Sequence, residues 1–286
     1  MRKIIDLSEA NGGVDWAAAA AHIDGAILRA GYRGWGSGGI VSDRMAQYHL
    51  DAAIAAGVPV GIYFVTQAIT EAEAVEEADW AVAALHGRPC RLPICLDDEP
   101  AGGANGRGRR DLVDNDTRTR TAVAFVRRIA ALGYTPALYC ANSWFRGMLD
   151  GEAVRAAGAL VWISSYPARR GAANVPPTVA WDGWQYSPWA SVPGIGTDVD
   201  MSWFRGALSG EEDNMTLEQF TSLLQQDRAT LQDNDAAAFS EAARRWAVES
   251  GLVQGGSGGS YMWQDFLTRE QLVTVLYRFA QLLGRA

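Results

Sequence analysis

The chain has 286 residues, of which 48% are apolar and 20% charged, so it can bury a sizeable core and is not an intrinsically disordered chain. Its apolar stretches are interrupted before about 18 residues, which excludes a membrane-spanning helix. The 25 basic and 33 acidic residues give a net charge of −8, which disfavours nucleic acid as a partner. The 11 Trp and nine Tyr residues suit stacking on uncharged sugar faces.

The N-terminus and the cysteines indicate where the protein is made. Residues 1–8 contain two basic residues but no apolar segment, and Asp6 and Glu9 come too early for a secretory signal. We therefore expect synthesis in the cytoplasm of the producing host without a signal peptide. Three cysteines are too few for a disulfide framework, and three scattered histidines give no zinc spacing. No metal or other cofactor is expected.

Short segments with β character alternate with helical segments through about residue 206. The predicted strands are residues 3–7, 25–29, 60–65, 92–96, 137–140, 160–164, 179–181 and 184–186. Capping residues and C-terminal glycines predict helices from Ser42 to Gly57, from Thr70 to Gly87, from about Thr117 to Gly133, and a short one after Asp150. This order predicts an α/β fold, an irregular TIM-like (β/α) barrel with fewer than eight helices.

The composition changes after residue 208. Residues 209–215 form a polar, acidic linker, and residues 216–286 are predicted to form a small all-α C-terminal domain. Its helices are expected from Thr216 to about Leu231, over residues 239–250, and from Thr268 to Gly284. The predicted domains are therefore 1–208, a barrel, and 216–286, a helical module.

Three consecutive carboxylates follow an apolar strand in the segment PICLDDEP, residues 93–100. Because strand side chains alternate, Asp97 and Glu99 are predicted to share one face and Asp98 to point the other way. The C-terminal strand ends of a barrel form its active-site face. Two carboxylates there repel each other, so one pKa is expected to rise, which is the arrangement that glycosidic cleavage needs. A cation site is the alternative, although hard cations usually need more oxygen ligands.

Two further acids are predicted to lie at the same mouth. Asp6 ends the first strand, and Asp200 lies near the end of the last β-segment. Because the first and last strands of a closed barrel are neighbours, both acids would flank Asp97 and Glu99. The alternative for each is a turn or helix-capping aspartate.

Taken in order, these motifs resemble glycoside hydrolase family 25, the lysozymes (muramidases) of phage endolysins and bacterial autolysins. The resemblance covers about the first 206 residues. It rests on residues 5–8, 13–16, 26–31, 55–63, 96–99, 137–139, 160–162, 184–187 and 200–204. Ser202 departs from the family, in which Asn is frequent at this position.

The resemblance implies cleavage of the β-1,4 bond between N-acetylmuramic acid and N-acetylglucosamine in peptidoglycan glycan strands. It implies Glu99 as general acid, Asp97 as its partner carboxylate, and Asp6 and Asp200 as the rest of an acidic floor. The aromatic residues implied to line the saccharide groove are Tyr63, Tyr139, Trp162 and Tyr186. Packing of the barrel is the competing explanation for each ring. Whether the anomeric centre is retained or inverted stays open.

The C-terminal residues resemble an S-layer homology-type unit, a family that anchors proteins to cell-wall polymers. The resemblance rests on residues 245–252, Trp263, 267–272 and 276–278. It implies that Trp246, Tyr261 and Trp263 bind a secondary cell-wall polymer. The alternatives are that these rings form the core of a small bundle, or that apolar helix faces form a homo-oligomer.

The leading interpretation is thus a peptidoglycan hydrolase of endolysin type that acts on the bacterial cell wall after release. Two alternatives remain at this point. One is a non-catalytic carbohydrate-binding barrel, and the other is a hydrolase of a related polymer such as chitin.

Overall fold

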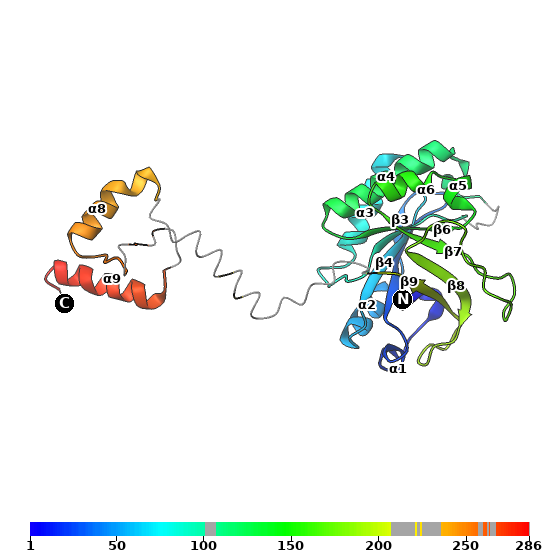
Figure 1. The fold of residues 1–286 in the computed structure, drawn as a ribbon, viewed down its shortest axis with the longest axis horizontal. Coiled ribbons are helices and arrows are strands. Elements are labelled where there is room, and N and C mark those ends of the chain that lie inside the picture. Colours follow the sequence, from blue (N-terminus) through cyan, green and yellow to red (C-terminus); the bar gives the residue numbers. More distant parts are fainter. Residues whose placement is uncertain are drawn as a thin grey trace. The chain divides into compact units, whose positions relative to one another are not determined.

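The computed structural model describes residues 1–100, 107–206, 221, 224, 236–256, 260–261, 263 and 267–285. The chain divides into two compact units, Met1–Glu211 and Glu212–Ala286 (Figure 1). The predicted linker and most of the predicted helix over residues 216–231 lie outside the described residues. In the described ranges, no helix has the length and apolar character that a bilayer crossing would need.

The first unit is built on a closed eight-stranded barrel, as predicted. Its strands follow in the order β1 (Arg2–Leu7), β2 (Gly25–Arg33), β4 (Val60–Val65), β5 (Ile94–Asp97), β6 (Pro136–Ala141), β7 (Leu160–Ser164), β8 (Gly183–Ala190) and β9 (Val199–Phe204). All neighbours from β1 to β8 are parallel. β9 closes the ring antiparallel to both β8 and β1. A short β3 (Ile40–Ser42) pairs with β2 outside the ring.

Fewer than eight helices cover the described part of the barrel, again as predicted. They are α1 (Trp16–Ala20), α2 (Ala46–Ala55), α3 (Glu71–Ala83), α4 (Asn115–Ala131), α5 (Trp144–Gly147) and α6 (Gly151–Ala156). Thr70 caps α3 by accepting from the Glu73 amide. The glycines predicted to end three helices, Gly57, Gly87 and Gly133, have positive φ.

Three local predictions were wrong. Ser42 does not cap a helix, because it ends β3 and α2 begins only at Ala46. Residues 179–181 form no strand, because the chain first pairs with β7 at Asp182, whose amide donates to the Val161 carbonyl, and β8 begins at Gly183. The strand β9 was not among the predicted strands, because its polar residues hide the apolar alternation.

Strand alternation separates two apolar regions. The larger one fills the space between the outer face of the barrel and the helices. The smaller one closes the barrel interior, with the buried side chains of Ile4, Ile27, Leu92, Cys95, Ala137, Tyr139, Trp162 and Phe204. Because every second residue of a strand points inward, the next inward positions on β1 and β5 are Asp6 and Asp97.

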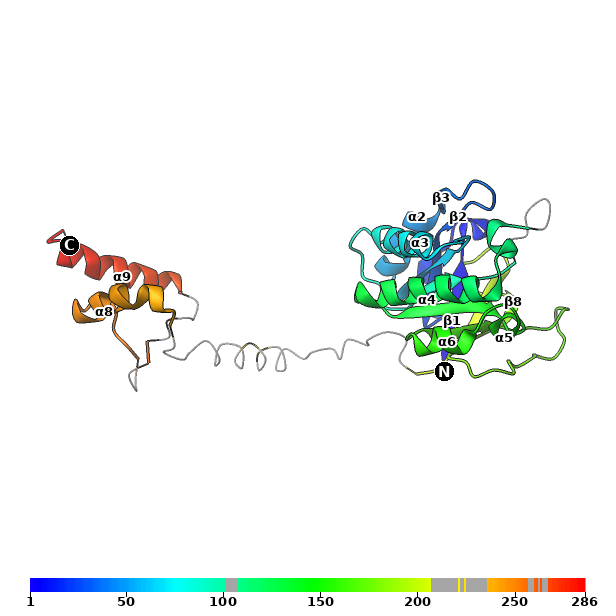
Figure 2. The ribbon, with the colours of Figure 1, turned by 90° about the horizontal axis from the view of Figure 1, so that it is seen from above.

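Helices α3 and α4 lie side by side on the outside of the barrel, next to β4, β5 and β6 (Figures 1 and 2). Between them and the sheet lies the layer that receives the outward side chains at the end of β5. The fold thus directs the inner face of β5 toward the barrel mouth and encloses its outer face beneath the helices.

The second unit contains η3 (Ala238–Ser240), α8 (Glu241–Glu249) and α9 (Arg269–Leu282). These elements confirm the helices predicted over residues 239–250 and after Thr268. The predicted capping box is formed, since Thr268 Oγ1 accepts from the Gln271 amide and Gln271 Oε1 from the Thr268 amide. Leu272, Leu276 and Phe279, the apolar stripe of α9, are exposed in the described part of this unit.

A buried histidine makes the stability of the barrel depend on pH. His49 is 1% exposed, lies edge-on against Trp16 and Tyr48, and burial lowers its pKa. The unfolded chain binds a proton near pH 6.5, the folded chain only at lower pH. Stability should therefore fall below about pH 6.5, by at most about 1.4 kcal/mol per pH unit.

We predict that His49→Leu removes this acid-side loss, measured as the free energy of unfolding in urea at several pH values. The exposed His22 is the control, and His22→Leu should keep the wild-type pH dependence. Parallel curves for wild type and His49→Leu would contradict the prediction.

Candidate active site

A small pocket of about 70 Å³ opens at the C-terminal ends of the parallel strands. Seven of the eight barrel strands contribute one side chain each, and Glu99 lies two residues after the end of β5. The lining residues are Asp6, Tyr63, Asp97, Glu99, Tyr139, Trp162, Gln185 and Asp200. The pocket therefore contains all four acids and three of the four barrel aromatics that the sequence singled out.

Asp6 and Asp200 lie opposite each other on the paired strands β1 and β9. Their side chains are hydrogen-bonded to each other, and burial followed by the charge of Asp200 raises the pKa of Asp6 well above its usual range. Burial also raises the pKa of Asp200, which the hydrogen bond from Asp6 partly offsets. Both carboxyl groups therefore bind a proton at higher pH than ordinary aspartates do.

Asp97 and Glu99 both point to the mouth but differ in exposure. Asp97 is 5% exposed, its Oδ1 has no hydrogen-bond partner among the described residues, and burial, then the charge of Glu99, raises its pKa well above the usual range. Glu99 is exposed to solvent, yet partial desolvation and then the charges of Asp200 and Asp98 raise its pKa. Both carboxyl groups therefore hold a proton at higher pH than usual.

Asp98 lies on the face opposite to Asp97 and Glu99, as the alternation predicted, and this face points away from the mouth. It is fully buried outside the barrel, where it pairs with Arg110 and Arg118. Burial alone would raise its pKa, but the two guanidinium groups hold it below the usual range. Of the three consecutive acids, only Asp98 is stabilised in its ionised form.

Gln185 is a site residue that the sequence analysis missed. The Tyr139 hydroxyl donates to Gln185 Oε1 at 2.9 Å, and Gln185 Nε2 donates to Asp6 Oδ2 at 3.0 Å. The carboxamide thus orients both neighbours. Because Gly183 points into the barrel, alternation along β8 would have identified Gln185 as the next inward residue.

Tyr186, the fourth predicted groove aromatic, is not brought to this pocket. Because Gln185 points inward, the next residue belongs to the other face of β8, where Tyr186 stacks on Trp203 at 5.7 Å. A role of Tyr186 in the wider saccharide groove stays a prediction.

Trp162 and Tyr139 form the apolar wall of the pocket. Their rings meet edge to face at 4.6 Å, and the Trp162 indole N–H donates to Ser202 Oγ at 3.0 Å. Ser202, the departure from the family pattern, therefore satisfies a buried donor.

A second aromatic pair lies near the acids. Tyr166 contacts Trp189 edge to face at 6.4 Å and is 41% exposed. Partial burial, then the charges of Asp200 and Glu99, raises the Tyr166 pKa. The sequence analysis did not single out this pair. Its one available signal was the position of Tyr166, two residues after the C-terminal end of β7.

The predicted wall-binding aromatics lie in the second unit. Tyr261 and Trp263 stack at 5.3 Å and line a pocket of about 610 Å³ together with residues of α9. The Arg244 guanidinium lies 5.7 Å from the Trp263 ring. Trp246 is 52% exposed and does not line this pocket. Two of the three residues are therefore brought together.

The acids do not form an obvious metal centre. Among the residues that the structure describes, no group of three or more His, Cys, Asp or Glu side chains is placed to hold a metal ion. The positive charge of Arg29 lowers the Asp97 pKa. The Arg29 guanidinium itself pairs with Asp43 and Glu9.

Comparisons with known proteins agree with this geometry. The family profile described as "Glycosyl hydrolases family 25" matches residues 5–195. No curated protein matches the chain in sequence. The modular autolysin LytC from Streptococcus pneumoniae has a similar structure, with 26% identity and a TM-score of 0.58 over 70% of this chain and 46% of that chain. This chain thus matches less than half of the length of LytC, which has also been solved with a synthetic peptidoglycan ligand.

Two more distant structures share the fold. The catalytic domain of endolysin ply40 from bacteriophage P40 of Listeria monocytogenes has 19% identity and a TM-score of 0.60, over 73% of this chain and 95% of that chain. The bacterial lysozyme from Streptomyces coelicolor has 23% identity and a TM-score of 0.55, over 77% and 98%. At these identities the likeness shows the fold alone.

The raised pKa of Asp97 predicts a gain in stability when its charge is removed. A folded-state pKa above the unfolded value means that stability is full at low pH and is lost as pH rises. Asp97→Asn should therefore raise the free energy of unfolding at neutral pH by about 1 to 2 kcal/mol. The gain should disappear toward about pH 3.9, where both states bind the proton.

Chemical denaturation at neutral and acid pH measures this difference. Asp51→Asn is the control, because the hydrogen bond from Arg88 lowers the Asp51 pKa and its removal should give no gain. If Asp97→Asn is as stable as wild type at every pH, the buried carboxylates are not destabilising.

Proposed function

The chain belongs to glycosyl hydrolases family 25, and from that premise we propose that it hydrolyses peptidoglycan at the bacterial cell wall. The bond cleaved is the β-1,4 link between N-acetylmuramic acid and N-acetylglucosamine. The observation that carries the proposal is the gathering of Asp6, Asp97, Glu99 and Asp200 in one pocket at the strand ends. The peptidoglycan ligand bound by the similar autolysin LytC supports the substrate class.

Glu99 is proposed as the general acid. It is the carboxyl group of the pocket that is exposed to solvent, so its side chain can reach a glycosidic oxygen above the mouth. Its raised pKa keeps a proton available at higher pH than for an ordinary glutamate. The proton passes to the leaving oxygen as the bond from this oxygen to the anomeric carbon breaks.

Asp97 is proposed as the partner carboxylate. Its Oδ1, free of hydrogen bonds within the described residues, can accept from the N–H of the substrate's N-acetyl group. This would orient the acetyl oxygen toward the anomeric carbon, where it acts as an internal nucleophile, or Asp97 would act more directly. Asp6 and Asp200, which lie opposite each other on β1 and β9, would supply negative charge beside the positive character of the departing ring.

The size of the pocket limits what enters it. About 70 Å³ holds two water molecules rather than a sugar ring. Tyr63, Tyr139 and Trp162 would therefore contact only the reacting edge of the saccharide. The glycan would run over the mouth, where Tyr166 and Trp189 offer further ring faces.

The C-terminal unit is proposed to bind a secondary cell-wall polymer. The stacked rings of Tyr261 and Trp263 beside a pocket of about 610 Å³ support this role, and the exposed Trp246 offers a further ring. Residues 211–286 carry 11 acidic and six basic residues, a net charge of −5. General attraction to anionic polymers is therefore disfavoured, and recognition would rest on specific contacts.

We predict that Glu99→Gln lowers the rate of wall hydrolysis about 10²- to 10⁴-fold, because the variant has no proton to donate. Mass spectrometry of wild-type digests should show new reducing-end N-acetylmuramic acid. Glu71→Gln, the same change at an exposed residue of α3, should clear walls like wild type.

Other outcomes identify the alternatives. Equal clearing by Glu99→Gln and wild type would end the assignment of Glu99. New reducing-end N-acetylglucosamine would mean the other bond, and activity on chitin oligomers alone would mean another polymer. Binding to walls without any hydrolysis would indicate a carbohydrate-binding barrel.

For the C-terminal unit we predict that Trp263→Ala weakens wall binding about tenfold or more, because ring stacking is lost. The measurement is co-sedimentation of the full chain with intact walls, in a Glu99→Gln background so that the walls survive. Phe239→Ala is the control, since Phe239 is 93% exposed and lies outside the pocket. Unchanged sedimentation of Trp263→Ala would contradict the assignment.

A further inference from the structure

The buried carboxylate of Asp98 is unusually well held. Arg110 donates to both of its oxygens, from Nε to Oδ1 at 2.8 Å and from Nη2 to Oδ2 at 2.7 Å. Arg118 Nη1 donates to Oδ1 at 2.7 Å. All three side chains are 1% exposed or less. Charge-assisted, bidentate bonds of this kind fix direction as well as distance.

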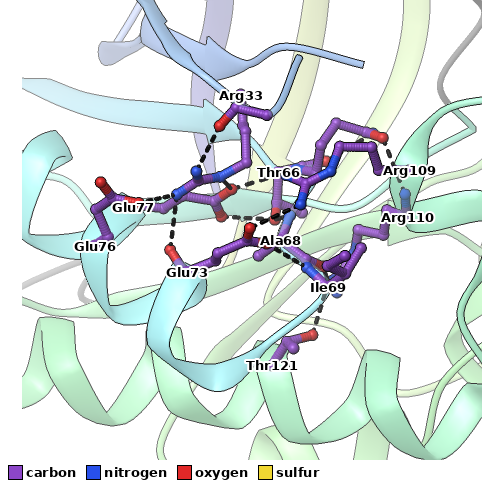
Figure 3. Close-up of polar contacts among 12 residues, drawn as sticks. Arg33, Thr66, Ala68, Ile69, Glu73, Glu76, Glu77, Arg109, Arg110 and Thr121 are labelled. Carbon is purple, nitrogen blue, oxygen red and sulfur yellow. Dashed lines mark hydrogen bonds and ion pairs between the residues drawn. The ribbon is translucent and has the colours of Figure 1, made fainter. Parts of the chain in front are cut away.

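The two arginines are themselves anchored to separate elements. Arg110 Nη1 donates to the Ala68 carbonyl at 2.8 Å and to Thr121 Oγ1 on α4 at 2.7 Å (Figure 3). Arg118 Nη2 donates to the Arg110 carbonyl at 2.7 Å, and its guanidinium lies 4.6 Å from the Trp144 ring of α5. Asp98 is thereby tied to the segment after β4 and to two helices.

The backbone of Asp97 is tied into the same layer. The Thr66 amide donates to the Asp97 carbonyl at 3.0 Å, and Thr66 Oγ1 donates to Glu77 Oε2 at 2.7 Å. Glu77 in turn accepts from Arg33 Nε at 2.7 Å, as Figure 3 shows. The end of β5 is thus held through both its main chain and its outward side chain.

We call the Asp98, Arg110 and Arg118 side chains the clamp. Its contacts bear on which residues of the acidic segment face the mouth. Asp97, Asp98 and Glu99 are all acidic, so the pattern alone does not say which of them should face the mouth. A shift of one residue would turn Asp98 inward and the other two outward. Among the described residues, the outer slot contains two guanidinium groups that pair with one carboxylate, and the lining of the mouth pocket contains no guanidinium group. The clamp therefore selects the register in which Asp97 and Glu99 point inward.

We propose that Asp98, clamped by Arg110 and Arg118, is a positioning residue that holds Asp97 and Glu99 toward the mouth. The inference rests on the proposed hydrolase function. The Asp98–Arg110 pair spans 12 positions, and Glu99 is the first residue of the segment that it closes. The backbone from which the Glu99 side chain extends is thus fixed on the side of Asp98.

The clamp has an electrostatic consequence that a purely structural ion pair would lack. The charge of Asp98 contributes to the raised pKa values of both Asp97 and Glu99. Burial contributes more to both values, as does the charge of Glu99 for Asp97 and of Asp200 for Glu99. Removing that charge should lower the Glu99 pKa. Because an acid catalyst must be protonated, the alkaline limb of the rate profile would then move to lower pH.

The test is Asp98→Asn in the full chain, compared with wild type by the release of reducing ends from solubilised glycan strands. We expect kcat to fall about 10- to 100-fold with little change in KM, because a displacement of about 1 Å has effects of this size. We also expect the alkaline limb of kcat/KM to move to lower pH. Thermal unfolding shows that the assayed protein is folded.

Glu77→Gln is the matched control. Glu77 is a buried carboxylate in the same layer and pairs with an arginine, but its charge does not contribute to the Glu99 pKa. The control should lose thermal stability while its alkaline limb stays in place. Should Asp98→Asn fail to fold, Arg118→Gln leaves Asp98 paired with Arg110 and must still lower kcat about tenfold or more.

Each result has one meaning. Wild-type kcat and an unmoved alkaline limb in folded Asp98→Asn would overturn the positioning role, as would wild-type kcat in Arg118→Gln if only that variant folds. An equal shift of the limb in Glu77→Gln would also overturn it. If wild type itself releases no reducing ends, the proposed function fails, which is distinct from a failure of the clamp.

Discussion

The constraint on which the structure depends is the confinement of four carboxyl groups around a space of about 70 Å³. Burial and mutual repulsion oppose their ionisation, so their pKa values rise and a rigid scaffold is needed to hold them together. Asp6 illustrates this, because burial and then the charge of Asp200 raise its pKa well above the usual range. Such a site is expected to reduce stability in exchange for reactivity.

Rigidity comes from two different layers at the end of β5, an uncharged layer inside the barrel and an ion-paired layer outside it. Inside the barrel, apolar rings and the Gln185 carboxamide surround the acids. Outside it, the Asp98 clamp binds the strand end to the helices, as does the Arg33–Glu77 pair that Figure 3 shows. Buried ion pairs are weak evidence for stability, but they can specify one arrangement of the chain among several. Here the arrangement is the direction of the proposed catalytic side chains.

Residue patterns located much of the fold and the acids. The apolar segments and helix caps gave the barrel, and the strand-end positions of Asp6, Asp97, Glu99 and Asp200 placed them at one mouth. The errors arose where local pattern and tertiary role diverge. Residues 179–181 were predicted as a strand, although β8 begins only at Gly183. β9 was not listed as a strand because its polar residues mask alternation that only pairing with β1 and β8 makes evident.

By itself, the sequence determined the order of the elements and which residues of β5 share a face, because both follow from periodicities of two and 3.6 residues. Only the tertiary structure decided which of the two faces is the mouth, since that depends on Arg110 and Arg118, 12 and 20 positions further along the chain. It also decided that Asp6 meets Asp200 and that Gln185 joins Tyr139 to Asp6. Contacts between distant segments leave no periodic trace in the chain, so local pattern cannot contain them.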